Sequence, residues 1–508
     1  MRPFVFFVTL VPVLGQPLLA LDGPVKLTLP DVVQAALTKN ASLAVRKLDP
    51  PIARTRVMWE RGAFDDTVSL QVQKQHTEAP TGSQLDGAKV SVTDVNTGNL
   101  GLATKFREGS TFGVNFNNQK NDSNSRFQTL NPYYQSTLVV NLTKPLLRGA
   151  GHRVNTAGIE IAKLGVRQSH YLLAKQVLDT VAQAERQYWD LLFARRDLEV
   201  KQQALDLARE LLAYNTRRQE VGLGSDVQVV EAQTSEATRL DDLEISRRLV
   251  QDAQELLRRT ISLRGQPPGV ELLPVSEPPP IPAGVPLTDA LAMAYAKRPD
   301  YQNLVLDLQS KNIRVVYLKS QRLPRIDLIT SYSQNGLDAT YADALDQVTR
   351  GDYDSYTLGF KVELPLQNRL ARADYRKGLL EKQQALLSLK AMEDQMEDEV
   401  TRAVRSLDTG IKRVSISNRA AELSARHLKA AETRYQQGLI ANFDLLRFQQ
   451  DLRDARSRAL QAMVNTLKNR IDVEATTGHL LESRRIVVES LQPPLPPELL
   501  KKGKGLWH

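Results

Sequence analysis

Arg218-Gln-Glu-Val-Gly222-Leu223-Gly-Ser225 and Arg434-Tyr-Gln-Gln-Gly438-Leu439-Ile-Ala441 are the matching stretches that decide the fold. In both, an arginine stands four residues before a Gly-Leu pair, and a glutamine follows the glycine by eleven residues. Glycine ends a helix readily because it adopts the left-handed conformation at little cost. Each stretch interrupts a long charged helical segment, so each predicts the tip of an antiparallel helical hairpin.

A polar residue shortly after each tip is expected to cap the returning helix. Its side-chain oxygen can accept a hydrogen bond from the free amides of the first helical turn. The candidates are Ser225 or Asp226 in the first copy and Asn442 in the second. The sequence therefore predicts a capped returning arm in both hairpins.

The segments that flank the tips have the spacing of coiled coils. We predict helical hairpins over residues 156–262 and 371–478, with outgoing helices roughly 90 Å long at about 1.5 Å per residue. Apolar residues recur every seven positions along the outgoing helices: Leu191, Leu198, Leu205, Leu212, Val400, Leu407, Val414, Ala421 and Leu428. This spacing predicts that the hairpins pack as long antiparallel coiled coils.

The chain is predicted to be a tandem duplication. An amphipathic helix that opens at Leu29 has a near-copy that opens at Leu287, with Asp, Ala and Lys in the same register. The first repeat spans 21–265 and the second 287–480, and a proline-rich linker over 266–286 joins them. Its composition predicts a stiff, extended crossing rather than a packed element.

After its opening helix, each repeat turns to strands in which apolar and polar residues alternate. These strands fall within residues 66–143 and 325–363. Residues 118–131 and 335–354 are rich in Asn, Asp, Ser and Gly and are predicted to be polar loops between strands. Together with the hairpins, the strands predict an α+β fold that is mostly helical.

The two ends of the chain are predicted to lie outside the repeats. A short basic start followed by an apolar run makes residues 1–20 fit a cleaved secretory signal peptide. Residues 481–508 are assigned to a C-terminal tail, in which the stretch from Pro493 to Lys504 is predicted to be an extended basic end. No later segment has the roughly 20 apolar residues that a transmembrane helix needs.

Composition argues against several classes of function. The 508 residues are 25% charged and 6% aromatic and include no cysteine, so disulfides and thiolate metal sites are excluded. The net charge is +9, but basic and acidic residues alternate along helix faces, which is typical of solvated helices rather than nucleic-acid binding. The six histidines lack metal-ligand spacing, and no nucleophile or phosphate-loop motif appears. We predict no catalytic residue, cofactor, metal site or nucleic-acid partner, and no enzyme.

The alternating strands suit a wall between lipid and water. Four to six strands from one chain cannot cross a bilayer alone, because the sheet edges would leave backbone groups unpaired in hydrocarbon. The smallest closed membrane barrels need about eight strands. If the strands cross a membrane, several chains must share one barrel. A solvated sheet packed on helices remains the open alternative.

The paired tips, duplicated opening helices and strands make the chain resemble the outer membrane efflux protein family, the TolC-like channels of Gram-negative bacteria. The resemblance implies a homotrimer with a shared β-barrel in the outer-membrane lipid and an α-helical barrel across the periplasm. It also implies a periplasmic adaptor at the hairpin tips and an inner-membrane transporter that supplies the energy. It implies two strands per repeat, so a hairpin near 99–117 is extra.

The resemblance also implies two sets of site residues. The tips that contact the adaptor are Arg218, Gly222, Leu223, Ser225, Arg434, Gly438 and Leu439. The periplasmic aperture is implied at the positions six and nine residues after each tip glycine: Gln228, Glu231, Asp444 and Arg447. Since only two of these four are acidic, we expect a network of Asp444, Glu231 and Arg447 rather than a ring of aspartates. Ordinary helix-surface charges are the alternative.

These expectations lead to three functional hypotheses. The first is the passive outer-membrane exit duct of a tripartite efflux or type I secretion system. The second is a periplasmic coiled-coil adaptor or scaffold. The alternating strands and the duplication favour the duct, because an adaptor needs one hairpin per chain. The third, an intracellular coiled-coil protein, requires the N-terminal apolar run to be accidental. None of the three identifies the transported substrate.

Overall fold

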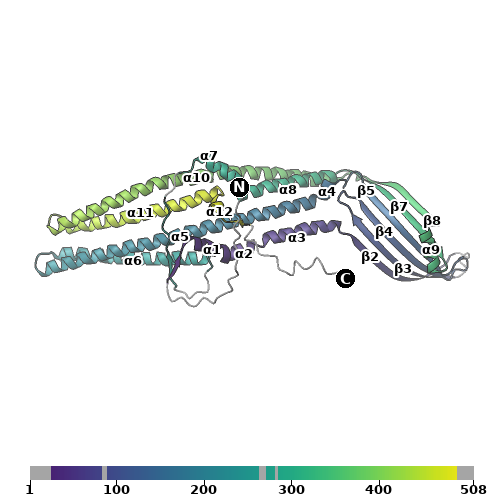
Figure 1. Cartoon of the computed structure of the whole chain (residues 1–508), viewed down its shortest axis with the longest axis horizontal. Coiled ribbons are helices and arrows are strands. Elements are labelled where there is room, and N and C mark those ends of the chain that lie inside the picture. Colours follow the sequence, from purple (N-terminus) through teal and green to yellow (C-terminus); the bar gives the residue numbers. More distant parts are fainter. Residues whose placement is uncertain (1–23, 83–88, 263–269, 281–283, 489–508) are drawn as a thin grey trace, which may run out of the picture. The chain divides into compact units, whose positions relative to one another are not determined.

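The computed structural model describes residues 24–82, 89–262, 270–280 and 284–488, and they group into two compact units (Figure 1). The first unit holds the residues up to Leu48, 172–299 and those from Glu393 onward; the second holds 49–171 and 300–392. The predicted signal peptide lies outside the described residues, as do the lysines of the predicted C-terminal tail.

Two helical hairpins dominate the fold, as the tip sequences predict. Helix α5 (Ala157–Glu220) returns as α6 (Asp226–Thr260), and α10 (Arg369–Gln436) returns as α11 (Asn442–Thr476). Residues at the predicted seven-residue spacing are buried, including Leu191, Leu205, Val400, Leu407, Val414 and Leu428. Within the described ranges, no helix combines the length and the apolar character needed to cross a membrane.

The core of the first unit gathers short elements around the hairpins. Strands β1 (Val25–Leu27) and β6 (Leu272–Pro274) pair in parallel, and the Tyr188 hydroxyl donates to the Leu27 carbonyl at 3.2 Å. The same hydroxyl accepts from the backbone amide of Ser276 at 2.8 Å. The remaining elements of this unit are α1 (Leu29–Lys39), α2 (Ala41–Arg46), α7 (Leu287–Lys297) and α12 (Leu480–Ser483).

One sequence expectation fails in this core. The proline-rich linker was expected to be unpacked, yet Leu272 within it is fully buried and belongs to β6. The prediction misses this because a three-residue apolar run between prolines carries no periodicity. Leu481, the first residue of the predicted tail, is also buried. The boundaries proposed for the repeats otherwise stay predictions.

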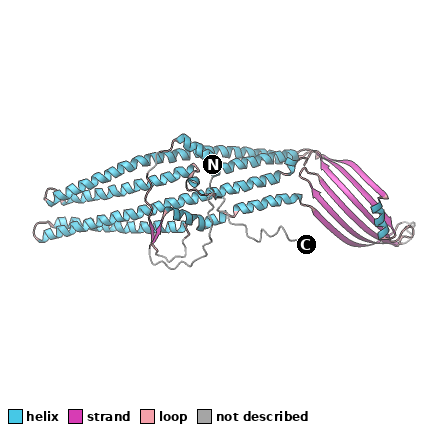
Figure 2. Cartoon of the chain, in the orientation of Figure 1, coloured by secondary structure: helices cyan, strands magenta, loops and turns pink. Residues whose placement is uncertain are grey.

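The second unit contains one sheet of six strands in the order β2-β3-β4-β5-β7-β8 (Figure 2), and every neighbouring pair is antiparallel. The strands are β2 (Thr67–Pro80), β3 (Val90–Lys105), β4 (Thr111–Ser123), β5 (Tyr133–Pro145), β7 (Arg325–Asp338) and β8 (Tyr353–Glu363). The other elements are α3 (Asp49–Arg61), η1 (Gly62–Phe64), α4 (His152–Asn155), α8 (Pro299–Gln321) and α9 (Tyr341–Arg350). The first half of the chain therefore supplies four strands and the second half two.

The register gives the sheet two faces of opposite character. In every strand pair, residues that lie opposite one another have numbers of the same parity, for example Leu70 with Leu100. Because opposed residues share a face and successive residues alternate, one face carries the even-numbered residues and the other the odd-numbered ones. We call these the even face and the odd face.

The even face carries a continuous apolar belt. The belt comprises Val68, Leu70, Val72, Leu100, Leu102, Phe112, Val114, Phe116, Leu138, Val140, Leu142, Ile326, Leu328, Tyr332, Tyr356, Leu358, Phe360 and Val362. Most of these side chains on the outermost strands are exposed. A belt of this size without cover is unusual for a soluble domain, since large apolar patches mark interaction surfaces.

The expectation of a polar loop over 335–354 is wrong. Strand β7 extends to Asp338, and α9 fills most of the remaining segment. Ala344 and Val348, four residues apart, form its buried side, a signal that the surrounding polar residues hide. The helix lies on the even face, because a side chain at Gly336 would meet the Ala344 carbonyl.

Candidate functional site

The two hairpin tips have the same backbone geometry. Gly222 has φ 75° and Gly438 has φ 76°, the left-handed conformation that glycine adopts without strain. The amide of Leu223 donates to the Arg218 carbonyl at 2.8 Å, and Leu439 makes the matching bond to Arg434 at 2.9 Å. These bonds satisfy carbonyls at the end of each outgoing helix, as in a Schellman motif.

The apolar residue after each tip glycine is left outside the fold. Leu223 is 70% exposed and Leu439 is 68% exposed. Val221 and Phe443 beside them are also exposed. Each tip therefore presents a small apolar surface that the described part of the chain leaves uncovered.

The first tip carries a complete helix cap. The Ser225 hydroxyl accepts a hydrogen bond from the amide of Val227 at 3.2 Å. The side-chain oxygen of Gln228 accepts a hydrogen bond from the amide of Ser225 at 3.4 Å. This reciprocal arrangement is a capping box. Arg218 also donates to the carbonyl of Leu223 at 2.9 Å. Ser225 caps α6 as predicted, and Gln228 has a role in its own chain.

The second tip has no equivalent cap, and the prediction that Asn442 caps α11 is wrong. The N-cap position is Ala441, whose side chain cannot accept a hydrogen bond. Asn442 lies one residue further on and is only 2% exposed. Its side-chain amide bonds to residues of α5, α6 and α10 instead of the first-turn amides of α11.

Asn442 belongs to a buried polar cluster that joins both hairpins. Its side-chain oxygen accepts from Asn215 at 3.0 Å and from the Tyr435 hydroxyl at 3.2 Å. Tyr435 also donates to Asn215 at 2.7 Å. The Asn442 nitrogen donates to the Glu231 carboxylate at 2.8 Å. Burial raises the pKa of Tyr435, which keeps its hydroxyl proton available as a donor.

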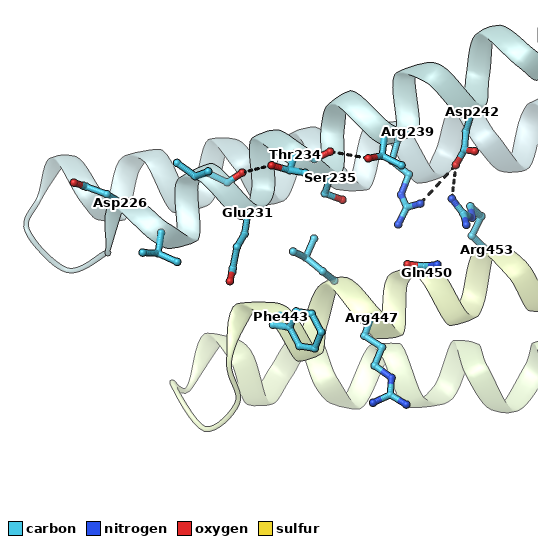
Figure 3. A pocket seen from close by; sticks show the side chains of 14 residues that line it. Asp226, Glu231, Thr234, Ser235, Arg239, Asp242, Phe443, Arg447, Gln450 and Arg453 are labelled. Atoms are coloured by element: carbon cyan, nitrogen blue, oxygen red, sulfur yellow. Dashed lines mark hydrogen bonds and ion pairs between the residues drawn. The ribbon is translucent and has the colours of Figure 1, made fainter.

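The four predicted aperture residues divide into two kinds. Gln228 and Glu231 bond within their own chain, to Ser225 and Asn442. Asp444 and Arg447 have no hydrogen bond or ion pair among the described residues. Figure 3 shows Arg447 on α11 with its guanidinium directed away from Glu231 on α6. Among the described residues of a single chain, Asp444, Glu231 and Arg447 do not form the predicted network.

A groove with a volume of about 690 Å³ runs between α6 and α11 beyond the tips. At one end, Arg239 and Arg453 share the Asp242 carboxylate (Figure 3). The pKa of Arg239 is lowered chiefly by its burial and secondly by the like charge of Arg453. The carboxylates of Asp242 and Asp454 oppose this effect, and Arg453 also pairs with Asp454 at 2.8 Å.

Sequence reasoning missed the polar cluster and the Asp242 contact. Asn215, Tyr435 and Asp242 have no periodicity or motif that separates them from ordinary helix-surface residues. One signal was available in the comparison of the two repeats. Ala431 is at the position equivalent to Asn215, and Asp226 is at the position equivalent to Asn442, so neither asparagine is shared by both copies. In the described residues, no group of three or more His, Asp or Glu side chains is arranged to hold a metal ion.

Comparison with solved structures identifies the fold. The Campylobacter jejuni CmeC outer membrane channel is similar at 15% identity, with 93% of this chain and 90% of that chain covered and a TM-score of 0.63. The Vibrio cholerae outer membrane protein VceC is similar at 15% identity, with 89% and 96% covered and a TM-score of 0.61. The open state of the Neisseria gonorrhoeae MtrE outer membrane channel is similar at 19% identity, with 89% of each chain covered and a TM-score of 0.60.

A family comparison by sequence settles the relationship. No curated protein matches the chain. The outer membrane efflux protein family matches residues 111–262 and 290–479, which is more than half of the chain. The two matched segments confirm the predicted duplication, and the match confirms the predicted outer-membrane location. The chain therefore belongs to the outer membrane efflux protein family.

Proposed function

We propose that the protein is a passive exit duct, in which three copies share one β-barrel in the outer membrane and their hairpins form a tunnel in the periplasm. The observation that carries this proposal is the two-faced sheet with free edges. An apolar even face and a polar odd face are what a wall between lipid and a water-filled lumen requires.

The edges of the sheet support assembly with other copies. Strands β2 and β8 each have a neighbour on one side only. In lipid, their free amides and carbonyls would each cost several kcal/mol if unpaired, on the order of the burial cost of an amide. The two strands run in opposite directions, so β2 of one copy can pair with β8 of the next in the antiparallel sense found throughout the sheet.

The hairpin tips are proposed to meet a periplasmic adaptor. The exposed Leu223 and Leu439 supply an apolar contact, and Gly222, Gly438, Arg218, Ser225 and Arg434 shape the turns that present it. The duct has no energy source of its own in this proposal, so an inner-membrane transporter reached through the adaptor drives transport. In this proposal, that transporter determines which substrate is transported.

We propose that Asp444 and Arg447 line the periplasmic aperture. Within the described part of their own chain they lack partners, so they are available to meet the same residues of neighbouring copies. Gln228 and Glu231, implied as aperture residues by the family resemblance, are assigned instead to the capping box and the polar cluster.

The scaffold hypothesis explains less. A periplasmic scaffold has no use for an apolar belt across six strands, and such a belt would promote aggregation in water. A solvated sheet packed on helices would cover its apolar face. Among the described helices, only α9 lies over the even face, and it covers the ends of β5 and β7 rather than the whole belt.

Disulfide cross-linking tests the shared barrel, because the natural chain has no cysteine. Gln71→Cys in β2 is combined in turn with Ser355→Cys, Thr357→Cys and Gly359→Cys in β8, all on the odd face. We expect at least one combination to yield covalent species of two and three copies in outer-membrane fractions under mild oxidation. Since the register between copies is set by the barrel, one of the three should dominate.

The matched control is Val72→Cys with the same β8 variants. It moves one thiol by a single residue to the opposite face of the sheet, so cross-linking should be lost. If the odd-face combinations remain monomeric while the protein is folded and in the membrane, the shared barrel is rejected.

A further inference from the structure

We propose that the β3–β4 hairpin (90–123) is part of the membrane wall, so that three copies enclose a barrel of eighteen strands. This inference rests on the proposed function. The alternative is that this hairpin stands outside the wall as a flap, which would leave four strands per copy and twelve in the trimer. The two arrangements differ in pore width.

The register places β3 and β4 inside the sheet. Strand β3 pairs with β2 from Thr67 to Pro80, and β4 pairs with β5 from Thr111 to Asn121. Neither strand is at an edge. Removing them from the wall would break both ladders and leave β2 without any partner in its own chain.

The side chains of the hairpin continue both faces of the sheet. Leu100, Leu102, Phe112, Val114 and Phe116 fill the centre of the apolar belt between β2 and β5. In a flap surrounded by water, apolar side chains aligned with the apolar belt of β2 and β5 would have no stabilising role. The strands therefore have the side-chain pattern of wall strands.

The odd face of the same strands is polar but uncharged over most of its length. Its residues in β3 and β4 include Thr97, Asn99, Asn115, Asn117 and Gln119. Across all six strands, the charged odd-face residues lie together near the strand ends that join the helices: Lys105, Arg325, Asp327, Lys361 and Glu363. The wall thus provides a neutral lumen with charges at its inner mouth.

The belt also ends before the outer ends of the strands. Beyond it, the even face carries Lys74, His76, Asp94, Lys120 and Asp122, which are charged or ionisable. Helix α9 lies on the same face at this level, with Tyr341 in edge-to-face contact with Tyr134. The six strands share this upper boundary, as expected of strands that cross one bilayer together.

The strand number has a direct functional consequence. Six strands per chain and three chains give eighteen. Barrel diameter grows roughly in proportion to strand number, and barrels of about 16–18 strands enclose an aqueous channel. An eighteen-stranded barrel would have about twice the cross-section of a twelve-stranded one. The outer end of the duct would therefore pass bulky solutes without selecting their charge.

Cysteine labelling in proteoliposomes tests whether the hairpin is in the wall. Val114→Cys on the even face and Asn115→Cys on the odd face are compared, using a charged, membrane-impermeant maleimide. We expect Asn115→Cys to react and Val114→Cys to be protected by lipid at least ten-fold in rate. Equal labelling of both would overturn the proposal, because a flap in water exposes both faces.

Leu358→Cys and Thr357→Cys in β8 serve as the reference pair. If this pair shows the difference but the β4 pair does not, the duct stands and the eighteen-stranded wall is rejected. If the reference pair also labels equally, the proposed function itself fails. The two failures are therefore distinguishable.

Single-channel conductance provides a second measurement. Deleting residues 83–123 removes β3 and β4 and joins β2 to β5 through the loop that precedes β5. We expect the barrel of this variant to exclude smaller polymers than the natural barrel does. When both proteins carry Asp444→Ala and Arg447→Ala to open the inner end, the conductance of the deletion variant should be lower, by up to about two-fold, because the unchanged helical tunnel is in series with the narrower barrel. An unchanged polymer cut-off would contradict the proposal.

Discussion

The two hairpin tips share a backbone but differ in how they are held. The first tip is completed by its own residues, through the Ser225–Gln228 capping box. The second has an alanine at the N-cap and depends on Asn442, which bonds to Asn215 and Glu231 of the first hairpin. Duplication therefore preserved the turn and divided the roles of the residues around it.

The difference also separates polar residues that bond within the described part of the chain from polar residues that do not. At matching positions after the glycine, the first copy uses Gln228 and Glu231 for contacts within the chain. The second copy has Asp444 and Arg447, with no partner among the described residues. Because the second tip is stabilised by the first hairpin, its residues Asp444 and Arg447 are not needed for contacts within the chain and can contact other copies.

The largest expected effect comes from breaking the contact that ties the second hairpin to the first. Asp242→Ala leaves Arg239 and Arg453 together without their shared carboxylate, at a cost of about 3 kcal/mol given partial exposure. Hydrogen exchange of α6 and α11 amides in the detergent-solubilised protein should accelerate. Asp241→Ala, an exposed neighbour, is the control and should change little.

Asn442→Ala should weaken the second tip more than the first. It leaves the buried amide of Asn215 and the half-buried carboxylate of Glu231 without one partner each, at a cost of about 2 kcal/mol. The measurement is exchange protection at residues 436–446 relative to 220–230. Equal loss at both tips would show that the cluster supports the hairpins together and that the tips do not differ in the proposed way.

The reciprocal variants Ser225→Ala and Ala441→Ser sharpen the comparison. Removing the cap should destabilise the first turn of α6 by about 1 kcal/mol, and supplying a hydroxyl should stabilise the start of α11 by up to about the same amount. Exchange rates of the first-turn amides give both values. No gain from Ala441→Ser would mean that the second tip cannot use a cap.

Asp444→Ala combined with Arg447→Ala should leave stability almost unchanged but raise single-channel conductance several-fold. The stability effect is small because neither side chain has a bond within the described part of its chain. Asp451→Ala with Arg458→Ala removes two exposed charges further along α11 and should not change conductance. Unchanged conductance in the first variant would remove Asp444 and Arg447 from the aperture.

The sequence predicts those parts of the fold that depend on local or periodic signals. The tip glycines, the seven-residue spacing and the opening helices at Leu29 and Leu287 lead to elements that begin and end close to where they are expected. Strand alternation also identifies the two faces, because the side-chain period of a strand is fixed at two.

Contacts that depend on tertiary structure were not predictable in the same way. Asn442 has the residue type and position of a helix cap, but the buried partners Asn215 and Tyr435 compete for its side chain. Helix α9 has only two buried residues among polar ones, and Leu272 sits in a segment that composition alone assigns to an open linker. In each case, packing overrides the local signal.

The most direct test of the duct is the mass of the native protein after extraction from the outer membrane. Native mass spectrometry of the detergent-solubilised species should give three times the mass of the mature chain, with no stable monomer. A folded monomer recovered from the soluble periplasmic fraction would contradict the shared barrel and, with it, the account of the sheet.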